Sequence, residues 1–378
     1  IPGTPNMGFR DLVIQQREND LVAASFGRGF YVLDDYSALR DMTPEVLKQK
    51  GTLFTPRTAK WFVPKSNLGN TGADFYIAKN PAFGAVFTYH LSDDFKTQKQ
   101  QRQESEKERS KNGRDIPFPG YDRLDAENQE TPAKVWLTIK DNDGNVIRNL
   151  YQKAEKGTHR LAWNLRHASI QAVNPDRVSD RNPSGPMVTP GNYSAQLYLQ
   201  QNGQIIPLGA SVNFEVKPIR EGVLKGVDYA TFDAYRKDYN AVSREVTVLR
   251  DQFAQAQKKA AALKMAARRA ESSPELFVED LNKIEQALFA LERKTTGSAA
   301  REEVGEKNPP NVQTHLSVAY RGLRTTYGPT GLHRQSLSIA QQMIALYRPE
   351  LEVITKQMLP QLEKKLKQSG APYIKGND

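Results

Sequence analysis

Residues 133–141 read AKVWLTIKD, and apolar and polar side chains alternate strictly along them. Successive side chains of a strand point to opposite faces, so a period of two predicts a half-buried β-strand. Val135, Leu137 and Ile139 are its apolar positions. Asn142-Asp143-Gly144 follows at once, and an Asp-Gly pair accepts the positive φ that a tight hairpin demands. The pattern therefore predicts a strand that runs into a hairpin turn.

Similar short apolar segments occur on both sides of this strand, with turn residues such as Asn202-Gly203 between them. They are ADFYIAK (73–79), GAVFTYHL (84–91), NVIRNLY (145–151), GTHRLAWNLR (157–166), GNYSAQLYLQQ (191–201) and QIIPLGASVNFEVKP (204–218). Six to eight short strands at regular spacing are typical of a β-sandwich. We expect this sandwich to cover residues 73–220.

Two motifs in these strands carry a family resemblance. One is Gly157-x-x-x-Leu161-x-Trp163-x-Leu165, and the other is Pro190-Gly191-x-Tyr193. Together they resemble the FlgD-type immunoglobulin-like module. The resemblance implies a structural spacer or docking domain and no catalysis.

A charged insertion, residues 92–131, interrupts the predicted sandwich. Its part from Lys96 to Arg114 holds seven basic and three acidic residues and almost no apolar ones, so it cannot bury a core. We expect an exposed helix or a mobile loop, which is either a partner-binding arm or a solvated helical excursion. Ile116, Phe118 and Tyr121 are expected to pin its far end to the sandwich.

The N-terminal residues 1–40 contain the apolar segments DLVIQQ (11–16) and LVAASFGRGFYVLDD (21–35). Two or three short strands cannot bury their faces alone. We therefore expect them to complete a sheet of other polypeptide, either upstream chain or a cleavage product. The chain begins without an initiator methionine or a signal segment, which indicates that a larger protein precedes it.

Residues 11–40 resemble the closing blade of bacterial sortilin-like (BNR-repeat) β-propeller proteins, which are often named glycosyl hydrolases by similarity. The matching residues are Ser25-Phe26-Gly27-Arg28-Gly29, then Phe30 to Leu33 and Asp34-Asp35. Phe26 stands where the family has histidine. The resemblance extends over most of the chain. It implies that residues 1–40 are the remnant of a last propeller blade. Residues 41–72 are rich in Pro, Gly and Thr, and we expect them to form a linker.

Asp34 and Asp35 are candidates for a glycosidase site, because such enzymes usually use two carboxylates that flank the sugar bond as catalytic groups. Adjacent strand residues point to opposite faces, however, so one carboxylate can line a propeller channel while the other caps the turn into Tyr36-Ser37. Arg28 either pairs with one of these carboxylates or faces a ligand in the channel. The structural alternative is favoured for all three residues.

From residue 221 to 378 the apolar period changes to that of helices. The longest stripe alternates steps of three and four over more than four heptads: Phe232, Tyr235, Tyr239, Val242, Val246, Leu249, Phe253, Ala256, Ala260 and Leu263. Ser273 is a predicted N-cap with Pro274 at the first helical position of a second helix. A short third helix and a fourth, bent by Pro349 and Pro360, follow. The pattern predicts an antiparallel helical bundle or hairpin.

We expect the long stripe to extend beyond its cover within the chain and to dock a partner protein. Tyr235, Tyr239, Val246 and Phe253 are the residues expected at that contact.

The residue content and motifs of the chain limit the kinds of functional site that it can hold. The chain has no cysteine, five scattered histidines, no common catalytic or phosphate-binding motif and no long apolar stretch. We expect no catalytic site, metal site, cofactor, membrane span or nucleic-acid partner in this chain. The net charge of +10 is spread out rather than clustered.

The sequence thus predicts the scaffold or docking region of an exported propeller protein, secreted or held in the periplasm or at the outer membrane. Its partners would be the propeller portion, other envelope proteins or a second copy. The alternative is the accessory tail of a carbohydrate-active hydrolase whose active site lies in the propeller.

Overall fold

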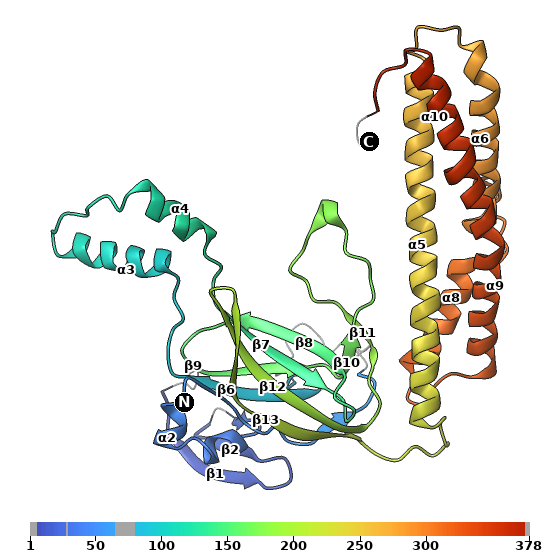
Figure 1. Cartoon of the computed structure of the whole chain (residues 1–378). Helices are drawn as coiled ribbons and strands as arrows, with labels where there is room; N and C mark the ends of the chain where they lie inside the picture. Colours follow the sequence, from blue (N-terminus) through green and yellow to red (C-terminus); the bar gives the residue numbers. More distant parts are fainter. Residues whose placement is uncertain (1–5, 28, 65–79, 375–378) are drawn as a thin grey trace. The chain divides into compact units, whose positions relative to one another are not determined.

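The structure is a computed structural model and describes residues 6–27, 29–64 and 80–374. The chain is a mixed β and α protein with several sheets and a separate set of helices (Figure 1). It divides into two compact units, which are described separately. The first comprises residues 1–169 and 180–221, and the second comprises residues 170–179 and 222–378.

The first unit holds all the described strands. They are β1 (Phe9–Gln15), β2 (Asp20–Ser25), β3 (Phe30–Leu33), β4 (Gly51–Leu53), β5 (Ala59–Trp61), β6 (Ala85–Leu91), β7 (Lys134–Lys140), β8 (Val146–Lys153), β9 (Gly157–Trp163), β10 (Arg166–Ala168), β11 (Ser184–Met187), β12 (Gly191–Gln201) and β13 (Gln204–Pro218). The short helices α1 (Ser37–Arg40) and α2 (Pro44–Leu47) follow β3.

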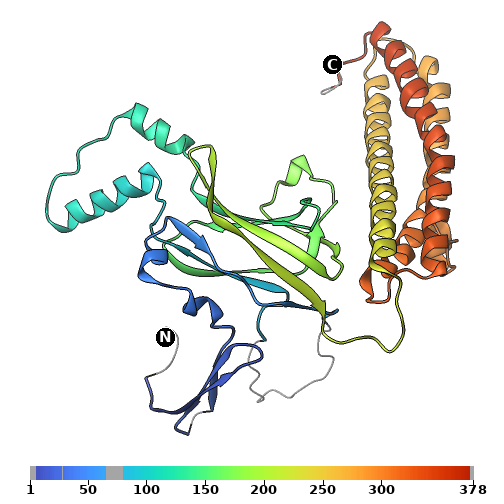
Figure 2. The ribbon, with the colours of Figure 1, turned by 60° about the horizontal axis from the view of Figure 1, so that its bottom comes forward.

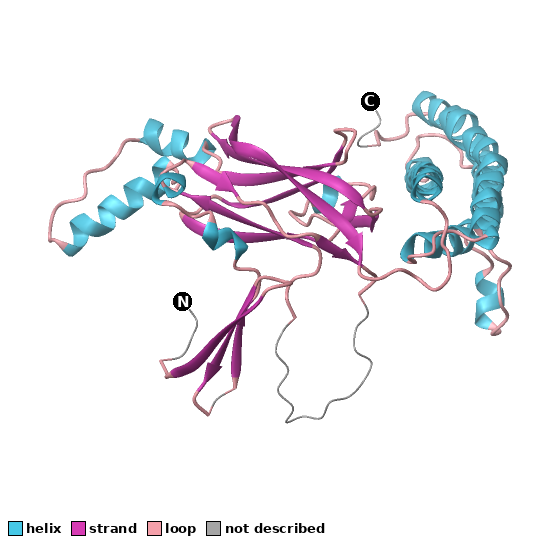
Figure 3. Ribbon diagram, turned by 90° about the horizontal axis from the view of Figure 1, so that it is seen from below, coloured by secondary structure: helices cyan, strands magenta, loops and turns pink. Residues whose placement is uncertain are grey.

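Two sheets of this unit share one apolar core. Their strand orders are β5-β13-β12-β7-β8 and β4-β6-β9, and β10 and β11 form a separate pair. Figure 3 shows the strands of this unit in magenta. The predicted alternation in β7 is confirmed, because Val135, Leu137 and Ile139 are fully buried in this core. At its centre the ring of Trp163 lies 5.4 Å from that of Tyr193, measured between centroids. Burial of large apolar side chains between the two sheets holds them together.

Part of the segment expected as a linker, 41–72, belongs to these sheets. β4 pairs with β6, and β5 pairs in parallel with the end of β13. Trp61 is buried and donates from its indole nitrogen to the carbonyl of Val188 at 2.7 Å. The short strands escaped the sequence analysis because three residues are too few to show a period. The strand expected at 73–79 lies outside the described residues.

Both predicted hairpin turns are confirmed. Between β7 and β8, Gly144 has a φ of +82°, and Asp141 Oδ1 accepts the backbone N–H of Asn145 at 2.8 Å. Between β12 and β13, Asn202 and Gly203 both have positive φ, at +52° and +74°. Two successive positive φ values suit the right-handed twist of the flanking strands.

The charged insertion forms two helices, α3 (Gln98–Lys111) and α4 (Tyr121–Gln129). Arg102 Nε donates to both carboxylate oxygens of Glu127, at 3.0 and 2.8 Å, which joins the two helices. The expectation that Ile116, Phe118 and Tyr121 pin the far end is wrong: all three side chains are exposed. The ion pair near the base of the arm, rather than apolar contacts at its tip, holds the helices together.

The second unit contains the helices expected from the periodicity. They are α5 (Tyr229–Ala267), α6 (Glu275–Thr295), α7 (Ala299–Glu303), α8 (Val312–Arg321), α9 (Gly331–Val353) and α10 (Leu359–Gln368), with 3₁₀ turns at Pro175–Arg177 and Gly322–Arg324. Asp228 caps α5 by accepting the N–H of Thr231 at 2.7 Å. The second helix begins one residue later than predicted, because Pro274 and not Ser273 occupies the N-cap position.

Two successive apolar clusters lie along α5. Residues of its first half, Phe232 to Val246, pack with α8 and α9, and residues of its second half, Leu249 to Ala267, pack with α6, α10 and the end of α9. Shorter helices therefore cover the 39-residue helix in two stages. Pro349 lies within α9, and a π-helical turn, Ile354–Met358, separates α9 from α10, where Pro360 lies in the first turn. The expected disturbance of the last helix is found at that turn.

Candidate functional site

The N-terminal strands form a three-stranded antiparallel sheet of order β1-β2-β3. In the described residues these strands pair with one another and with no strand of the larger sheets. Leu12 lies opposite Ala23, and Ala23 lies opposite Tyr31. Val13 likewise lies opposite Val22, and Val22 lies opposite Val32. The register therefore assigns each side chain to one of two faces.

Apolar side chains lie on both faces of this sheet, and both faces are exposed. The first face carries Phe9, Leu12, Ile14, Leu21, Ala23, Tyr31 and Leu33 beside Ser25, and the second carries Val13, Val22, Ala24, Phe30 and Val32 beside Asp11, Gln15 and Asp20. Leu12 is 62% exposed on the first face and Phe30 is 77% exposed on the second. An antiparallel sheet that meets water on one side normally carries polar residues there. A sheet that is apolar on both sides requires cover on both sides.

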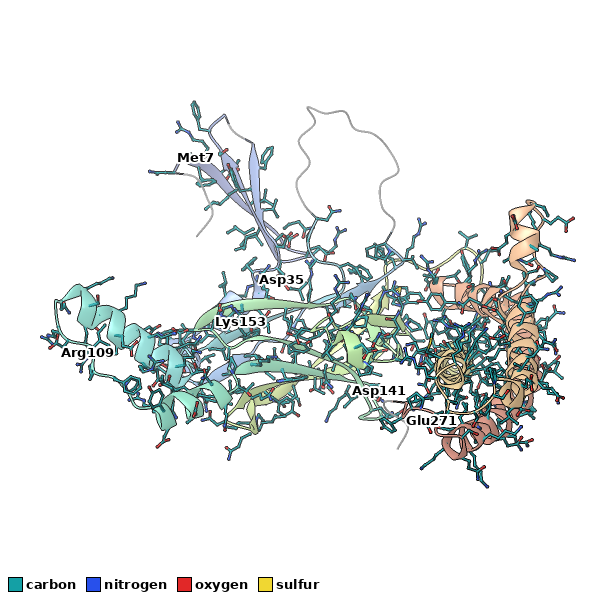
Figure 4. All side chains as sticks on the ribbon, turned by 90° about the horizontal axis from the view of Figure 1, so that it is seen from above. Met7, Asp35, Arg109, Asp141, Lys153 and Glu271 are labelled. Atoms are coloured by element: carbon teal, nitrogen blue, oxygen red, sulfur yellow. The ribbon has the colours of Figure 1, made fainter. Side chains whose placement is uncertain are left out.

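Figure 2 shows the ribbon of this sheet in dark blue. Two arginines of the larger sheet domain hold one end of it. Arg57 donates to the carbonyl of Glu18 at 2.9 Å and lies 3.5 Å from the Asp20 carboxylate, at the β1–β2 turn. Arg160 donates to the carbonyls of Asp34 and Asp35, at 2.6 and 2.7 Å. Figure 4 labels Met7 at the free end of the sheet and Asp35 at the held end. In the described part of the chain, these arginine contacts anchor the sheet at the end near Asp35.

Asp35 has a structural role. Its φ is +44°, and its Oδ1 accepts the hydroxyl of Ser37 at 2.5 Å and the N–H of Ser37 at 3.3 Å. Its own N–H donates to Asp20 Oδ1 at 2.9 Å. The carboxylate caps the turn into Tyr36-Ser37, as the structural alternative predicted. Asp34 is partly exposed, and Arg28 lies outside the described residues.

The structure covers the residues expected to dock a partner. Tyr235, Tyr239 and Val246 are buried in the first cluster along α5, and Phe253 packs against the second. The docking role expected for these four residues is therefore corrected. The sequence analysis compared α5 with single shorter helices, whereas successive helices cover its stripe in turn.

Burial also explains why the phenol of Tyr235 stays protonated. Its hydroxyl lies 2.9 Å from the carbonyl oxygen of Ala319 and 3.1 Å from that of His333. Removal from water raises the pKa of this phenol to about 12, because the phenolate loses its hydration. Tyr235 joins α5 to α8 and α9 as a neutral donor.

The five histidines and the acidic residues form no cluster of metal-binding spacing in the described part of the chain. His159 lies against the ring of Tyr89, with centroids 5.4 Å apart, and its Nε2 is 2.8 Å from the carbonyl oxygen of Glu155. None of the described helices combines the length and apolar character needed to cross a bilayer. Two hollows in the described residues have volumes of about 480 and 460 Å³. The first is lined by residues of β12 and β13 with Asp141 and Asn142, and the second by residues of α5 and α9.

Arg148 was missed in the sequence. It faces the core from β8, opposite Ile139, and its guanidinium donates to three backbone carbonyls. Loss of hydration on burial lowers the pKa of this arginine. The available signal was an arginine at an inward position of a period-two segment, NVIRNLY.

No family profile matches this chain, and no curated protein is similar to it.

Proposed function

We propose that this chain is a non-catalytic scaffold region of an exported β-propeller protein, and that β1–β3 complete its last blade. The exposure of apolar side chains on both faces of that sheet carries the proposal. In a propeller, blades are arranged radially around a channel, so each blade has a neighbouring blade on either face. Two exposed apolar faces on one small sheet suit that environment.

The number of strands supports the same arrangement. Propeller blades have four strands, and the described N-terminal sheet has three. Among the described strands, none pairs with the outer edges of β1 and β3, where a further strand from other polypeptide can pair. The resemblance of residues 11–40 to a closing blade agrees with this. In this arrangement the partner supplies one further strand at an edge of the sheet and the two sheets that cover its faces.

We also propose that the two larger sheets are an immunoglobulin-like sandwich of the FlgD type. Trp163 is buried between the sheets, and the Tyr193 hydroxyl donates to the carbonyl of Thr189, four residues upstream, at 2.6 Å. A tyrosine bonded to upstream backbone beside a buried tryptophan is a hallmark of immunoglobulin-like sandwiches. In this role the sandwich is a rigid spacer between the propeller and the helices, and the helical unit contacts other envelope proteins or a second copy.

Site-specific photo-crosslinking tests the proposal. A photoreactive amino acid is placed at Leu12 on one face or at Phe30 on the other, in cells that produce the complete protein. We expect each position to cross-link to a different β-strand segment of propeller-repeat sequence, identified by mass spectrometry. Leu39, on α1 and 56% exposed, is the matched control and should give neither product. Cross-links from both faces to residues 37–378, or to a second copy of this chain, would refute the proposal.

A further inference from the structure

The outward face of the five-stranded sheet carries a row of aromatic side chains. Tyr151 lies directly opposite Trp136, Trp136 opposite Tyr198, and Tyr198 opposite Pro207, on β8, β7, β12 and β13. These four strands are neighbours in the sheet. At about 4.8 Å between strands, the row is roughly 14 Å long. The three rings are partly exposed, so the row forms a strip on the surface.

The polar atoms of two of these rings already have partners. The indole nitrogen of Trp136 donates to Gln200 Oε1 at 2.6 Å, and the hydroxyl of Tyr151 donates to the carbonyl of Asp180 at 2.7 Å. The two ring centroids are 5.1 Å apart. A ligand therefore meets rings whose orientation is already set, which lowers the entropic cost of binding.

Lysines flank the row. Lys134 lies directly opposite Lys153, and Lys140 lies two positions beyond Thr138 on β7. Like charges directly opposite on neighbouring strands destabilise a sheet. No described carboxylate lies within 4.0 Å of these three ammonium groups. Glu215, a carboxylate on the same face, is already paired with Lys217 at 2.8 Å.

We propose that this face binds a polysaccharide that contains uronate residues. The apolar C–H face of a pyranose ring stacks on Trp136 and Tyr198, as an aromatic surface favours. The carboxylate of the sugar lies between Lys134 and Lys153 and relieves their repulsion. The amide groups of Gln200 and Asn149 donate to hydroxyls, because their oxygens already accept from Trp136 and Thr138.

The position of Lys134 favours a uronate over a nucleic acid. Its Nζ lies 5.2 Å from the centroid of the Tyr151 ring. The anionic group must therefore be attached close to the ring that stacks. A uronate carboxylate is a substituent of the pyranose itself, whereas the phosphate of a nucleic acid is separated from the base by a sugar. The residues described for the aromatic row and the three lysines that flank it include no arginine, the side chain that binds phosphate in a bidentate manner.

Titration calorimetry with the complete chain tests this proposal. The probes are oligomers of galacturonate, glucuronate and mannuronate, a neutral maltohexaose, and a single-stranded oligonucleotide. We expect at least one uronate oligomer to bind at least tenfold more tightly than maltohexaose, and this preference to shrink as salt is raised. Trp136→Ala should weaken that binding at least tenfold, and Lys153→Gln about threefold to tenfold.

Controls separate recognition from folding. Lys153 is exposed, so Lys153→Gln should leave the thermal midpoint unchanged, and the exposed Lys156→Gln should change neither binding nor stability. Tyr121→Ala removes an aromatic ring that is 76% exposed on α4 and should leave uronate binding intact. The proposal fails if no uronate oligomer binds, if Trp136→Ala and Lys153→Gln bind normally, or if the oligonucleotide binds more tightly and is lost in the same variants. These outcomes do not depend on the N-terminal sheet.

Discussion

Arg148 donates a hydrogen bond from Nη2 to the carbonyl oxygen of Asn182 at 2.5 Å, across 34 residues of sequence. Its Nη1 donates to the carbonyls of Pro183, at 2.5 Å, and His167, at 3.3 Å. The side chain is 3% exposed. A single buried cation therefore joins both ends of the segment that runs from β10 to β11. Charged donors to carbonyl oxygens make stronger hydrogen bonds than neutral donors do.

Replacing this arginine should loosen that segment. We expect Arg148→Met to keep the fold and to lose about 1–3 kcal/mol of the free energy of unfolding, because three carbonyls lose their donor. Trypsin should cleave more rapidly at Arg177 and Arg181, which lie in the segment. Urea unfolding and timed proteolysis measure the two effects. Arg17→Met, at a side chain that is 80% exposed, should change neither. Unchanged cleavage in Arg148→Met would contradict the role of this residue.

Tyr235 predicts a pH dependence for the helical unit. Its pKa is about 12 in the fold and near 10 in the unfolded chain. A raised pKa stabilises the fold fully below pH 10, and this contribution is lost as the pH rises from 10 through 12. Between pH 10 and pH 12 the free energy of unfolding of Tyr235→Phe should therefore fall by about 2 kcal/mol less than that of the wild type. Urea unfolding followed by circular dichroism at 222 nm measures this difference in stability.

At neutral pH the same variant should be less stable by about 1–2 kcal/mol, because it loses the one hydroxyl donor that the carbonyl oxygens of Ala319 and His333 share. Tyr327→Phe, at a side chain that is 45% exposed, is the control and should keep the wild-type stability at neutral pH. Equal alkaline losses in Tyr235→Phe and wild type would show that the phenol of Tyr235 does not titrate with unfolding.

Two glycines should differ sharply in their tolerance of alanine. Gly84 has a φ of +109°, and a Cβ there would lie 1.9 Å from the carbonyl oxygen of Trp163. Gly144 has a φ of +82° but open space around it. We expect Gly84→Ala to cost about 3 kcal/mol or more, since the β6–β9 pairing must shift, and Gly144→Ala about 1–2 kcal/mol. Thermal unfolding of both variants measures this, and equal losses would contradict it.

The arginine anchor of the N-terminal sheet is also testable. Arg160→Ala removes the donors to the carbonyls of Asp34 and Asp35. We expect backbone amides of β1–β3 to exchange with deuterium faster, while those of β7 and β12 stay protected. Mass spectrometry of peptic fragments distinguishes the two regions. Lys156→Ala, in the connection that leads from β8 into β9, is the control. Equal exchange in β1–β3 of the variant and wild type would show that Arg160 does not restrain the sheet.

The sequence alone determined the local elements of this protein. A strict period of two identified β7, two turn pairs located its hairpins, and a stripe with steps of three and four identified α5 to within a few residues. These signals are local, because strand pleat, turn φ values and helical repeat depend on neighbouring residues. The structural role of Asp35 followed from the same local geometry.

Only the tertiary structure decided which surfaces are covered. The stripe through Tyr235 and Phe253 has the same pattern whether a partner or the same chain covers it, and α8, α9, α6 and α10 cover it here. Conversely, Ile116 at the tip of the arm is exposed. The inward arginine on β8 and the cross-strand row through Trp136 depend on strand register between distant segments. Burial and register arise from contacts remote in sequence, so periodicity along one segment cannot specify them.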